Sequence, residues 1–461
     1  MTTPFDASLE KALKIIETAD LAGLAFSASS MGQAGQVFEK RVVLVRDLFG
    51  RIHLAFGERP KADGLKIQVA ELAASWHDQL KKYSPSEGSE FFFSDELLVP
   101  EALWQSPDLV LLGQVSKDGV KVYLYDRALG GQDWIRSSLQ SDGDRVPRLI
   151  FHGIKGGVGR SSALAMSARR LAELGKRVLV VDLDLESPGL TSILLDPERL
   201  PEFGLVDYFV ESASENLTIA DFVSREGVIY QRSFLSDGTQ GEIFVVPAYG
   251  IAAGDYIAKL SRTYVETPSD RSSNTRGFAE RLHDFLLSLE QVLHPDVVLL
   301  DSRAGIDDIG AAIIGRLGGH TLLFGTSSSQ TWRGYELLFD HLKYRRPRLD
   351  AQAAFKVVAA LVPETNRALY IDSLRERAYE TFSSSLYEEI QGGQLSDNNF
   401  SINSEDAPHF PLSVFWRREY MEFDPLKNHD LFDGKQVDAV FGELLEYVVG
   451  FAASAGLVTN A

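Results

Sequence analysis

The segment 153–161 combines residue types that can hold phosphate groups, because it reads Gly-Ile-Lys-Gly-Gly-Val-Gly-Arg-Ser. Its glycines allow the backbone to curl tightly and to turn N–H groups toward phosphate oxygens. A short apolar run precedes it, and alanines and leucines at helical spacing follow it, which predicts a strand, a loop and a helix. The start of the helix adds a partial positive charge. We expect this loop to hold the phosphates of a nucleoside triphosphate through Gly156, Gly157, Val158, Gly159, Arg160, Ser161 and Ser162.

One position of the loop departs from the common phosphate-binding pattern G-x-x-x-x-G-K-[ST]. Arg160 stands where the pattern has lysine, and an additional lysine, Lys155, lies early in the loop. Arginine is a planar fork and does not replace lysine freely at a tight phosphate site. Two placements are open: Arg160 neutralises the β- and γ-phosphates, or it lies outside the loop and Lys155 supplies the charge. We expect the Ser161 hydroxyl on Mg²⁺ and Ser162 near the α-phosphate.

Carboxylates follow two further apolar runs. Asp182 and Asp184 come after one run of four apolar residues, and Asp301 comes after another. Ligands of open parallel sheets bind at the carboxyl ends of the strands, so these side chains are expected beside the phosphate loop. Asp182 and Asp184 are expected to hold Mg²⁺ through water and to position the attacking water, and the Asp301 carboxylate is expected to reach Mg²⁺. The alternative for the first pair is that they cap the next helix. Gly305 is expected to donate its N–H to the γ-phosphate.

The elements that must position these residues alternate along the chain. Apolar strand-like runs and helical patterns follow one another from residue 148 onward, with runs at 178–181, 243–246, 297–300, 321–324 and 357–361. This alternation predicts an α/β fold with a mainly parallel sheet and helices on both faces.

Three parts of the chain differ in pattern. Residues 148–461 form the expected nucleotide-binding domain, and the polar stretch 141–147 is the expected linker. Residues 1–140 read as a smaller α+β domain, with helices predicted at 6–18 and 65–80 and a hairpin predicted at 41–56.

Composition narrows the function classes. The chain has 461 residues, a net charge of −19 and no cysteine, which excludes disulfides, thiolate catalysis and cysteine-based metal sites. The acidic charge disfavours DNA as a partner, because non-specific affinity for DNA comes mainly from neutralising phosphates. No run approaches 18 apolar residues, no signal peptide is evident, and the helix predicted at 436–453 has an acidic polar face. A membrane is therefore not an expected partner, and a cytoplasmic location is expected.

The three motifs, in this order, resemble the ParA/MinD group of P-loop ATPases over roughly residues 147–450. That group carries a deviant Walker A motif, K-G-G-x-G-K-[ST], and the Lys-Gly-Gly-Val-Gly-Arg run looks like a small variant subgroup. The resemblance implies a P-loop NTPase fold, with Lys155, Asp184 and Asp301 as catalytic residues. Lys155 matches the signature lysine that reaches the nucleotide of the facing subunit in an ATP-sandwich dimer. Asp301 and Gly305 match the switch II pattern.

Two hypotheses of function follow. In the first, the protein is an ATPase switch that dimerises around Mg–ATP, hydrolyses it slowly and signals to a protein partner of unknown identity. In the second, it is a nucleotide-binding scaffold whose hydrolysis is impaired by Arg160.

Two further residue sets carry weaker expectations. Arg303 either supplies a positive charge near the γ-phosphate, in the manner of an arginine finger, or pairs with Asp307 or Asp308. The loop 362–366 after the run 357–361 is the expected place for contacts to the adenine base, through Asn366 or the backbone near Pro363.

Overall fold

The computed structural model falls into two compact units, Met1–Arg136 and Ser137–Ala461. Residues 141–145 of the expected linker lie outside the described residues. The structure describes residues 4–32, 35–106, 108–115, 119–127, 132–134, 136, 138–139, 146–252, 254–268, 275–345, 351–388, 398–420, 423–427, 429–432 and 434–458.

The first unit is built on a six-stranded mixed sheet in the order β4-β3-β2-β6-β5, with β1 paired to β2. The long strand β2 runs antiparallel to β1 and β3 and parallel to β6. The strands are β1 (Phe26–Gly32), β2 (Gly35–Arg46), β3 (Ile52–Phe56), β4 (Phe91–Phe93), β5 (Leu109–Val115) and β6 (Val120–Asp126). The helices are α1 (Phe5–Thr18), α2 (Asp63–Leu80) and α3 (Pro100–Trp104).

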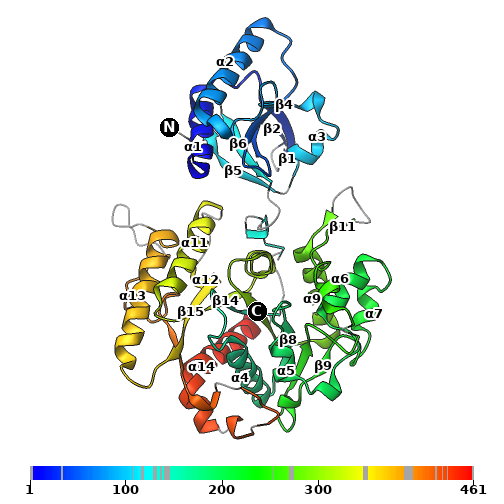
Figure 1. The fold of residues 1–461 in the computed structure, drawn as a ribbon, viewed down its shortest axis with the longest axis vertical. Helices are drawn as coiled ribbons and strands as arrows, with labels where there is room; N and C mark the ends of the chain where they lie inside the picture. The colour runs from blue at the N-terminus through cyan, green and yellow to red at the C-terminus, as the bar shows by residue number, and fades with distance from the viewer. Residues whose placement is uncertain are drawn as a thin grey trace. The chain divides into compact units, whose positions relative to one another are not determined.

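Helices α1 and α2 cover one face of this sheet (Figure 1). Ala12 and Ile15 from α1 and Leu72 and Trp76 from α2 are buried against inward-facing residues of β2, β3 and β6. Successive side chains of a strand point to opposite faces, so only alternate residues reach this core. The indole N–H of Trp76 donates to the Ile52 carbonyl at 2.7 Å and fixes α2 to β3.

The second unit is built on an eight-stranded sheet in the order β16-β15-β14-β7-β13-β8-β10-β9. Neighbouring strands are parallel, except that β9 pairs antiparallel with β10 at one edge. The strands are β7 (Arg148–Gly153), β8 (Arg177–Asp182), β9 (Gln231–Arg232), β10 (Glu242–Val246), β13 (Val297–Ala304), β14 (His320–Gly325), β15 (Phe355–Val362) and β16 (Leu412–Phe415). A separate two-stranded ribbon joins β11 (Thr267–Pro268) to β12 (Thr275–Arg276).

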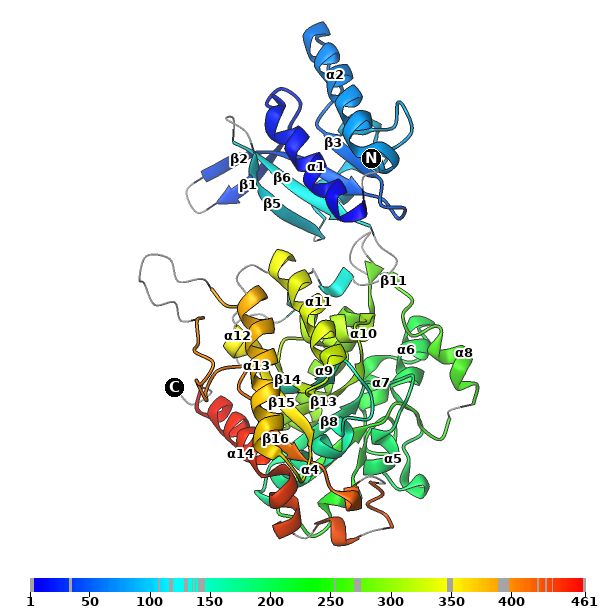
Figure 2. The same cartoon turned by 60° about the vertical axis from the view of Figure 1, so that its left-hand side comes forward.

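Helices lie on both faces of the eight-stranded sheet (Figure 2). Leu149 and Phe151 of β7 belong to a core shared with α4 and α14, whereas Ile150 between them belongs to a core shared with α6, α7 and α9. This alternation is what a strand buried on both faces requires. The helices are α4 (Arg160–Glu173), α5 (Leu190–Leu194), α6 (Leu205–Ala213), α7 (Ile219–Val223), α8 (Tyr256–Leu260), α9 (Phe278–Leu293), α10 (Asp308–Gly310), α11 (Ser329–Arg345), α12 (Ala351–Ala354), α13 (Arg367–Ser385) and α14 (Gly434–Val458).

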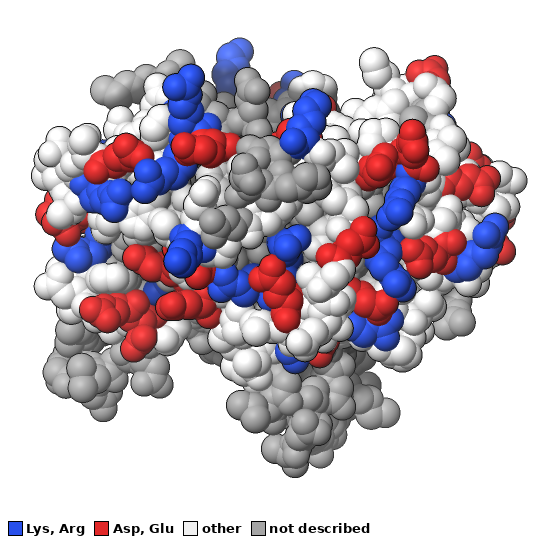
Figure 3. All heavy atoms as spheres, turned by 90° about the horizontal axis from the view of Figure 1, so that it is seen from below, with Lys and Arg blue, Asp and Glu red and all other residues white. Residues whose placement is uncertain are grey.

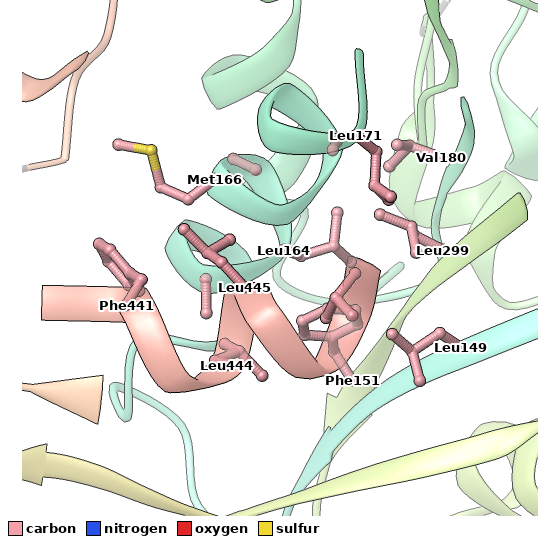
Figure 4. Close-up of a cluster of buried hydrophobic side chains, with 14 of the residues drawn as sticks. Leu149, Phe151, Leu164, Met166, Leu171, Val180, Leu299, Phe441, Leu444 and Leu445 are labelled. Atoms are coloured by element: carbon pink, nitrogen blue, oxygen red, sulfur yellow. The ribbon is translucent and has the colours of Figure 1, made fainter. Parts of the chain in front are cut away.

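Helix α4, which begins at the phosphate loop, packs together with α14 into one hydrophobic core. Leu164 and Leu171 of α4 and Leu444 of α14 are buried against Leu299 and other residues of the central strands (Figure 4). Each fully buried leucine contributes about 1.5–3 kcal/mol of hydrophobic stabilisation relative to exposure. The start of α4 is therefore held firmly against the sheet.

The mainly parallel sheet with helices on both faces is confirmed, and an N-terminal sheet domain is present. Three details differ from the sequence-based expectations. The sequence pattern at 275–293 also predicts a helix, but that helix, α9, begins only at Phe278, because Thr275 and Arg276 pair with β11. Strand β16 and the short edge strand β9 were not predicted, since Ser413 interrupts the apolar run of β16 and β9 consists of two polar residues.

Candidate functional site

The phosphate loop lies at the middle of the eight-stranded sheet. It joins β7, which pairs with β13 on one side and β14 on the other, to the start of α4. Gly157 has a φ of 72° and Gly159 a φ of 79°, a left-handed conformation that residues with a Cβ rarely adopt. The loop therefore has the backbone form that its glycines predict, and it opens at the N-terminus of α4.

Arg160 is the first residue of α4, and its side chain is almost fully buried. Its Nη2 lies 3.3 Å from Oδ2 of Asp184, in a loop that follows β8. Its Nη1 makes no hydrogen bond within the described part of the chain, and neither does Oδ1 of Asp184. Arg160 thus lies at the loop rather than outside it, with half of its guanidinium group uncommitted.

Ser161 and Asp301 meet beside this arginine. The Ser161 hydroxyl donates to Oδ2 of Asp301 at 2.7 Å, while Oδ1 of Asp301 is buried and has no hydrogen-bond partner among the described residues. Burial raises the pKa of Asp301 to about 6. A hydroxyl and a carboxylate oxygen are the hard ligands that Mg²⁺ prefers. The pair therefore fits a magnesium ion shared with nucleotide phosphates.

The surroundings of this pair bear on which kind of metal site it could form. Among the residues that the structure describes, no three histidine or acidic side chains gather as a metal site. Magnesium in nucleotide sites is held by one or two protein groups together with substrate phosphates and water. The donor set of Ser161 and Asp301 fits that kind of site.

Asp182 is placed differently from Asp301. Its Oδ2 accepts the backbone N–H of Thr191 at 2.9 Å and the Thr191 hydroxyl at 2.7 Å, at the start of α5. Its Oδ1 accepts the Asp184 N–H at 3.3 Å. Both oxygens are engaged, which favours the helix-capping alternative over direct metal contact. Burial, reinforced by the nearby Asp301, raises the pKa of Asp182 to about 7.

Gly305 lies beside the phosphate loop in this structure. Its N–H, expected to contact the γ-phosphate, donates instead to the Gly153 carbonyl at 2.9 Å. Its φ of 108° shows that this segment uses the freedom of glycine. For its N–H to reach a phosphate, the hydrogen bond to Gly153 must first break.

Arg303 is not directed at the phosphate loop by its contacts. Its Nη1 lies 3.1 Å from Oε1 of Glu186, and its Nε lies 3.6 Å from Oδ2 of Asp307. The Tyr264 hydroxyl donates to the same Glu186 oxygen at 2.9 Å. The ion-pair alternative is therefore the one that the geometry favours, with Glu186 as a partner that sequence inspection did not suggest.

Lys155 and His152 flank the loop. The Lys155 ammonium group donates to Oε1 of Gln330, near the start of α11. His152 is buried, and its Nδ1 lies 3.1 Å from the Ser302 hydroxyl. Burial lowers the pKa of His152 to about 3, so this ring stays neutral at physiological pH.

A cavity of about 420 Å³ opens at the N-terminus of α4. One end is formed by the phosphate loop and Arg160, and the other by aromatic and apolar side chains. The residues lining it are Gly157, Gly159, Arg160, Ser161, Ser162, Leu361, Val414, Phe415, Trp416, Arg417, Tyr420, Val440 and Phe441. The volume falls within the usual range for small-molecule sites.

The aromatic end of this cavity was missed by sequence inspection. The expected base contacts at Pro363 and Asn366 are absent from the lining, and Asn366 instead caps α13 with a φ of 56°. Leu361, just before them, does line the cavity and has a φ of 54° at an irregularity of the β15–β16 pairing. Residues in such strained backbone conformations occur more often at ligand-binding sites than elsewhere. The available signal was the cluster of aromatic residues at 415–420.

Within the described ranges of the chain, no helix combines the length and the apolar content that crossing a membrane requires.

Two solved structures with a similar fold contain a ParA and a MinD. A structure of pNOB8 ParA bound to nonspecific DNA is 17% identical, covers 67% of this chain and 99% of its own, and gives a TM-score of 0.42. A chain of the MinC:MinD cell division protein complex of Aquifex aeolicus is 15% identical to this chain. The match covers 66% of this chain and 96% of the other, with a TM-score of 0.40.

A third similar structure is cobyrinic acid a,c-diamide synthase from Mycobacterium smegmatis with bound ADP and magnesium. It is 18% identical, covers 51% of this chain and 82% of its own, and gives a TM-score of 0.36. No curated protein matches the chain significantly. The family model described as the CobQ/CobB/MinD/ParA nucleotide binding domain matches residues 149–396, which is more than half of the chain. The protein therefore belongs to the CobQ/CobB/MinD/ParA nucleotide-binding family.

Proposed function

We propose that this protein binds ATP with Mg²⁺ in the cavity at the start of α4 and hydrolyses it slowly, as a nucleotide-operated switch. One observation carries the proposal. The cavity ends at the phosphate loop, where Nη1 of Arg160 and Oδ1 of Asp301 are buried and have no hydrogen-bond partner among the described residues. Buried polar groups in native proteins are normally satisfied, so such atoms mark a place where a ligand completes the site.

The phosphates are assigned to the loop end of the cavity. The backbone N–H groups at 156–162 and the positive end of α4 favour an anion there, and Arg160 adds a full positive charge. Ser161 and Asp301 hold the magnesium ion, which neutralises charge on the β- and γ-phosphates when it is bound.

The base is assigned to the aromatic end. The exposed Trp416 is assigned to stack on the base beside Phe415 and Tyr420, and Arg417 adds a cation held by Glu364 at 2.7 Å. These residues follow the stretch 149–396 that the family model matches. The residues assigned to select the base, at 415–420, therefore lie outside the stretch that the family model matches.

Hydrolysis requires a water molecule beside the γ-phosphate. The water oxygen bonds to the γ-phosphorus, and the bond from that phosphorus to the β–γ bridging oxygen breaks, so that ADP and inorganic phosphate leave. Asp184 is assigned to orient this water, because its Oδ1 is uncommitted and burial raises its pKa. The arrangement adds electrostatic stabilisation and positioning rather than covalent chemistry.

We propose that the ATP-bound form is a homodimer in which Lys155 reaches the nucleotide of the facing subunit. Lys155 contacts Gln330 in this structure, on the rim of the phosphate loop. Size-exclusion chromatography with and without Mg–ATP tests this for the wild type, Lys155→Ala and Arg160→Ala. Nucleotide-dependent dimerisation that survives Lys155→Ala would contradict the sandwich dimer.

A partner is needed for a switch to have an effect. MinD, a similar protein, has been solved in complex with MinC, and we propose a protein partner for this chain as well. DNA is not excluded by the acidic charge, because a ParA has been solved on nonspecific DNA, and that sequence-based expectation is unsupported. On the face shown in Figure 3, basic and acidic side chains are interspersed rather than gathered by sign. A DNA-binding assay with and without Mg–ATP therefore belongs beside the search for a protein partner.

The second candidate is a nucleotide-binding scaffold without turnover. It is favoured by one observation, which is that the guanidinium group in the lysine position already contacts Asp184, the side chain assigned to water. Isothermal titration with Mg–ATP, together with phosphate release, separates the two candidates. Binding with phosphate release supports the switch, binding without release supports the scaffold, and absence of binding contradicts both.

A further inference from the structure

The two terminal nitrogens of Arg160 have different surroundings. Nη2 lies 3.3 Å from Oδ2 of Asp184, whereas Nη1 is buried without a hydrogen-bond partner in the part of the chain that is described. The residue is 6% exposed and lines the cavity at its phosphate end. The guanidinium group is thus held by a protein carboxylate on one arm, while the other arm is buried without a hydrogen-bond partner among the described residues.

We propose that Arg160 is a positioning residue that joins the bound phosphates to Asp184, one arm on each. This inference rests on the proposed binding of Mg–ATP. Nη1 donates to oxygens of the β- and γ-phosphates, while Nη2 keeps the Asp184 carboxylate beside the γ-phosphorus. Arginine suits this task because its donors form a rigid planar fork that engages two anions at once.

The carboxylate of Asp184 needs such support. It follows β8 in a loop, and its Oδ1 makes no hydrogen bond to any described residue. The neighbouring loop contacts are made by backbone groups, with the Asp184 N–H bound to Asp182 and its carbonyl bound to the Ser187 N–H. The backbone of this loop is therefore fixed, and Arg160 is the side chain that fixes the orientation of the carboxylate.

A lysine at position 160 would act differently. Its ammonium group is a compact point charge on a flexible stem and would satisfy the phosphates without spanning to Asp184. Phosphate binding would survive the substitution, whereas the position of Asp184 would be lost. The arginine that looks like damage to the motif is, on this inference, the part that couples nucleotide binding to water positioning.

The decisive experiment is Arg160→Lys in the full chain, assayed by steady-state phosphate release and by affinity for Mg–ATP. We expect kcat to fall about 10- to 100-fold, because small misplacement of a reacting group has effects of that size. We expect KM and the affinity for Mg–ATP to change by less than about threefold, because the positive charge is kept. Arg170→Lys, on the same helix and paired with Glu173 and Asp438, is the control and should leave kcat unchanged.

A second variant guards against a fold defect in the first. Asp184→Asn should lower kcat. The kcat of the double variant Arg160→Lys/Asp184→Asn should be no lower than that of Asp184→Asn alone, because Arg160 acts on the water only through Asp184. Multiplying effects, or a kcat of Arg160→Lys equal to or above that of the wild type, would overturn the inference. A fall in affinity equal to the fall in kcat would show a merely structural arginine and overturn it too.

The proposed function can fail separately from this inference. A wild type that does not bind Mg–ATP contradicts the proposed function itself. A wild type that binds Mg–ATP but releases no phosphate leaves nucleotide binding intact and overturns the positioning role of Arg160.

Discussion

The Ser161 hydroxyl lies 2.7 Å from Oδ2 of Asp301, although 140 positions separate the two residues in the chain. Strand β13 and helix α4 bring them together, with Asp301 inside β13 and level with Asp182 at the end of β8, and with Ser161 at the start of α4. The hydrogen bond leaves Oδ1 of Asp301 without a partner among the residues described. The Ser161 and Asp301 oxygens are the protein ligands that we propose for Mg²⁺.

The first prediction concerns this pair. Ser161→Ala and Asp301→Asn should each weaken binding of Mg–ATP by about tenfold or more, because each removes a polar contact to a charged group. Their binding of ATP measured in EDTA should change much less. Titration calorimetry with and without Mg²⁺ measures both. Ser167→Ala, on the same helix with its hydroxyl bound to the Ala163 carbonyl, is the matched control.

The second prediction concerns the aromatic end of the cavity. Trp416→Ala should weaken binding of ATP by about 1–3 kcal/mol, the range for stacking of a base on an aromatic side chain. Binding of inorganic tripolyphosphate, which has no base, should not change. Phe49→Ala, at an exposed aromatic residue of the first unit, serves as the control. Equal losses for ATP and tripolyphosphate would remove Trp416 from the base site.

The third prediction concerns pH and Asp182. Burial and the nearby Asp301 raise the pKa of this carboxyl group in the folded protein to about 7, from an ordinary value of 3.8. Its contribution to stability is therefore full below about pH 4 and is lost as pH rises through about 7. Asp182→Asn keeps an oxygen for Thr191 and removes the charge. Melting curves from pH 5 to 8 should show a smaller decline of Tm with pH for the variant than for the wild type, and parallel curves would contradict the assignment.

The fourth prediction concerns a buried ion pair that supports β7. Arg148 is 1% exposed and donates from Nε to Oε1 of Glu290 at 2.9 Å and from Nη1 to the Leu317 carbonyl at 2.9 Å. Glu290→Ala should lower the free energy of unfolding by about 3–5 kcal/mol, because it leaves a buried charge uncompensated. Glu173→Ala removes a half-exposed partner of Arg169 and should cost no more than about 1 kcal/mol. Denaturant unfolding of the full chain compares the two.

Much of the fold follows from local patterns. The parallel sheet is predictable because strands buried on both faces read as continuous apolar runs, as in β8 and β13. The phosphate loop is predictable because its glycines and the helix after it lie close together in the chain, where spacing alone carries the geometry. Strand β16 could not be predicted, since its four residues are recruited by pairing with β15 rather than by any pattern of their own.

The sequence by itself determined the presence of a phosphate loop, the placement of acidic residues at the ends of two central strands, and the family. The tertiary structure decided which groups meet. It placed Asp182 on Thr191, Arg160 on Asp184, and the aromatic residues at 415–420 across from the loop. Such contacts join residues far apart in the chain, so they depend on how whole elements pack, and no local spacing encodes them.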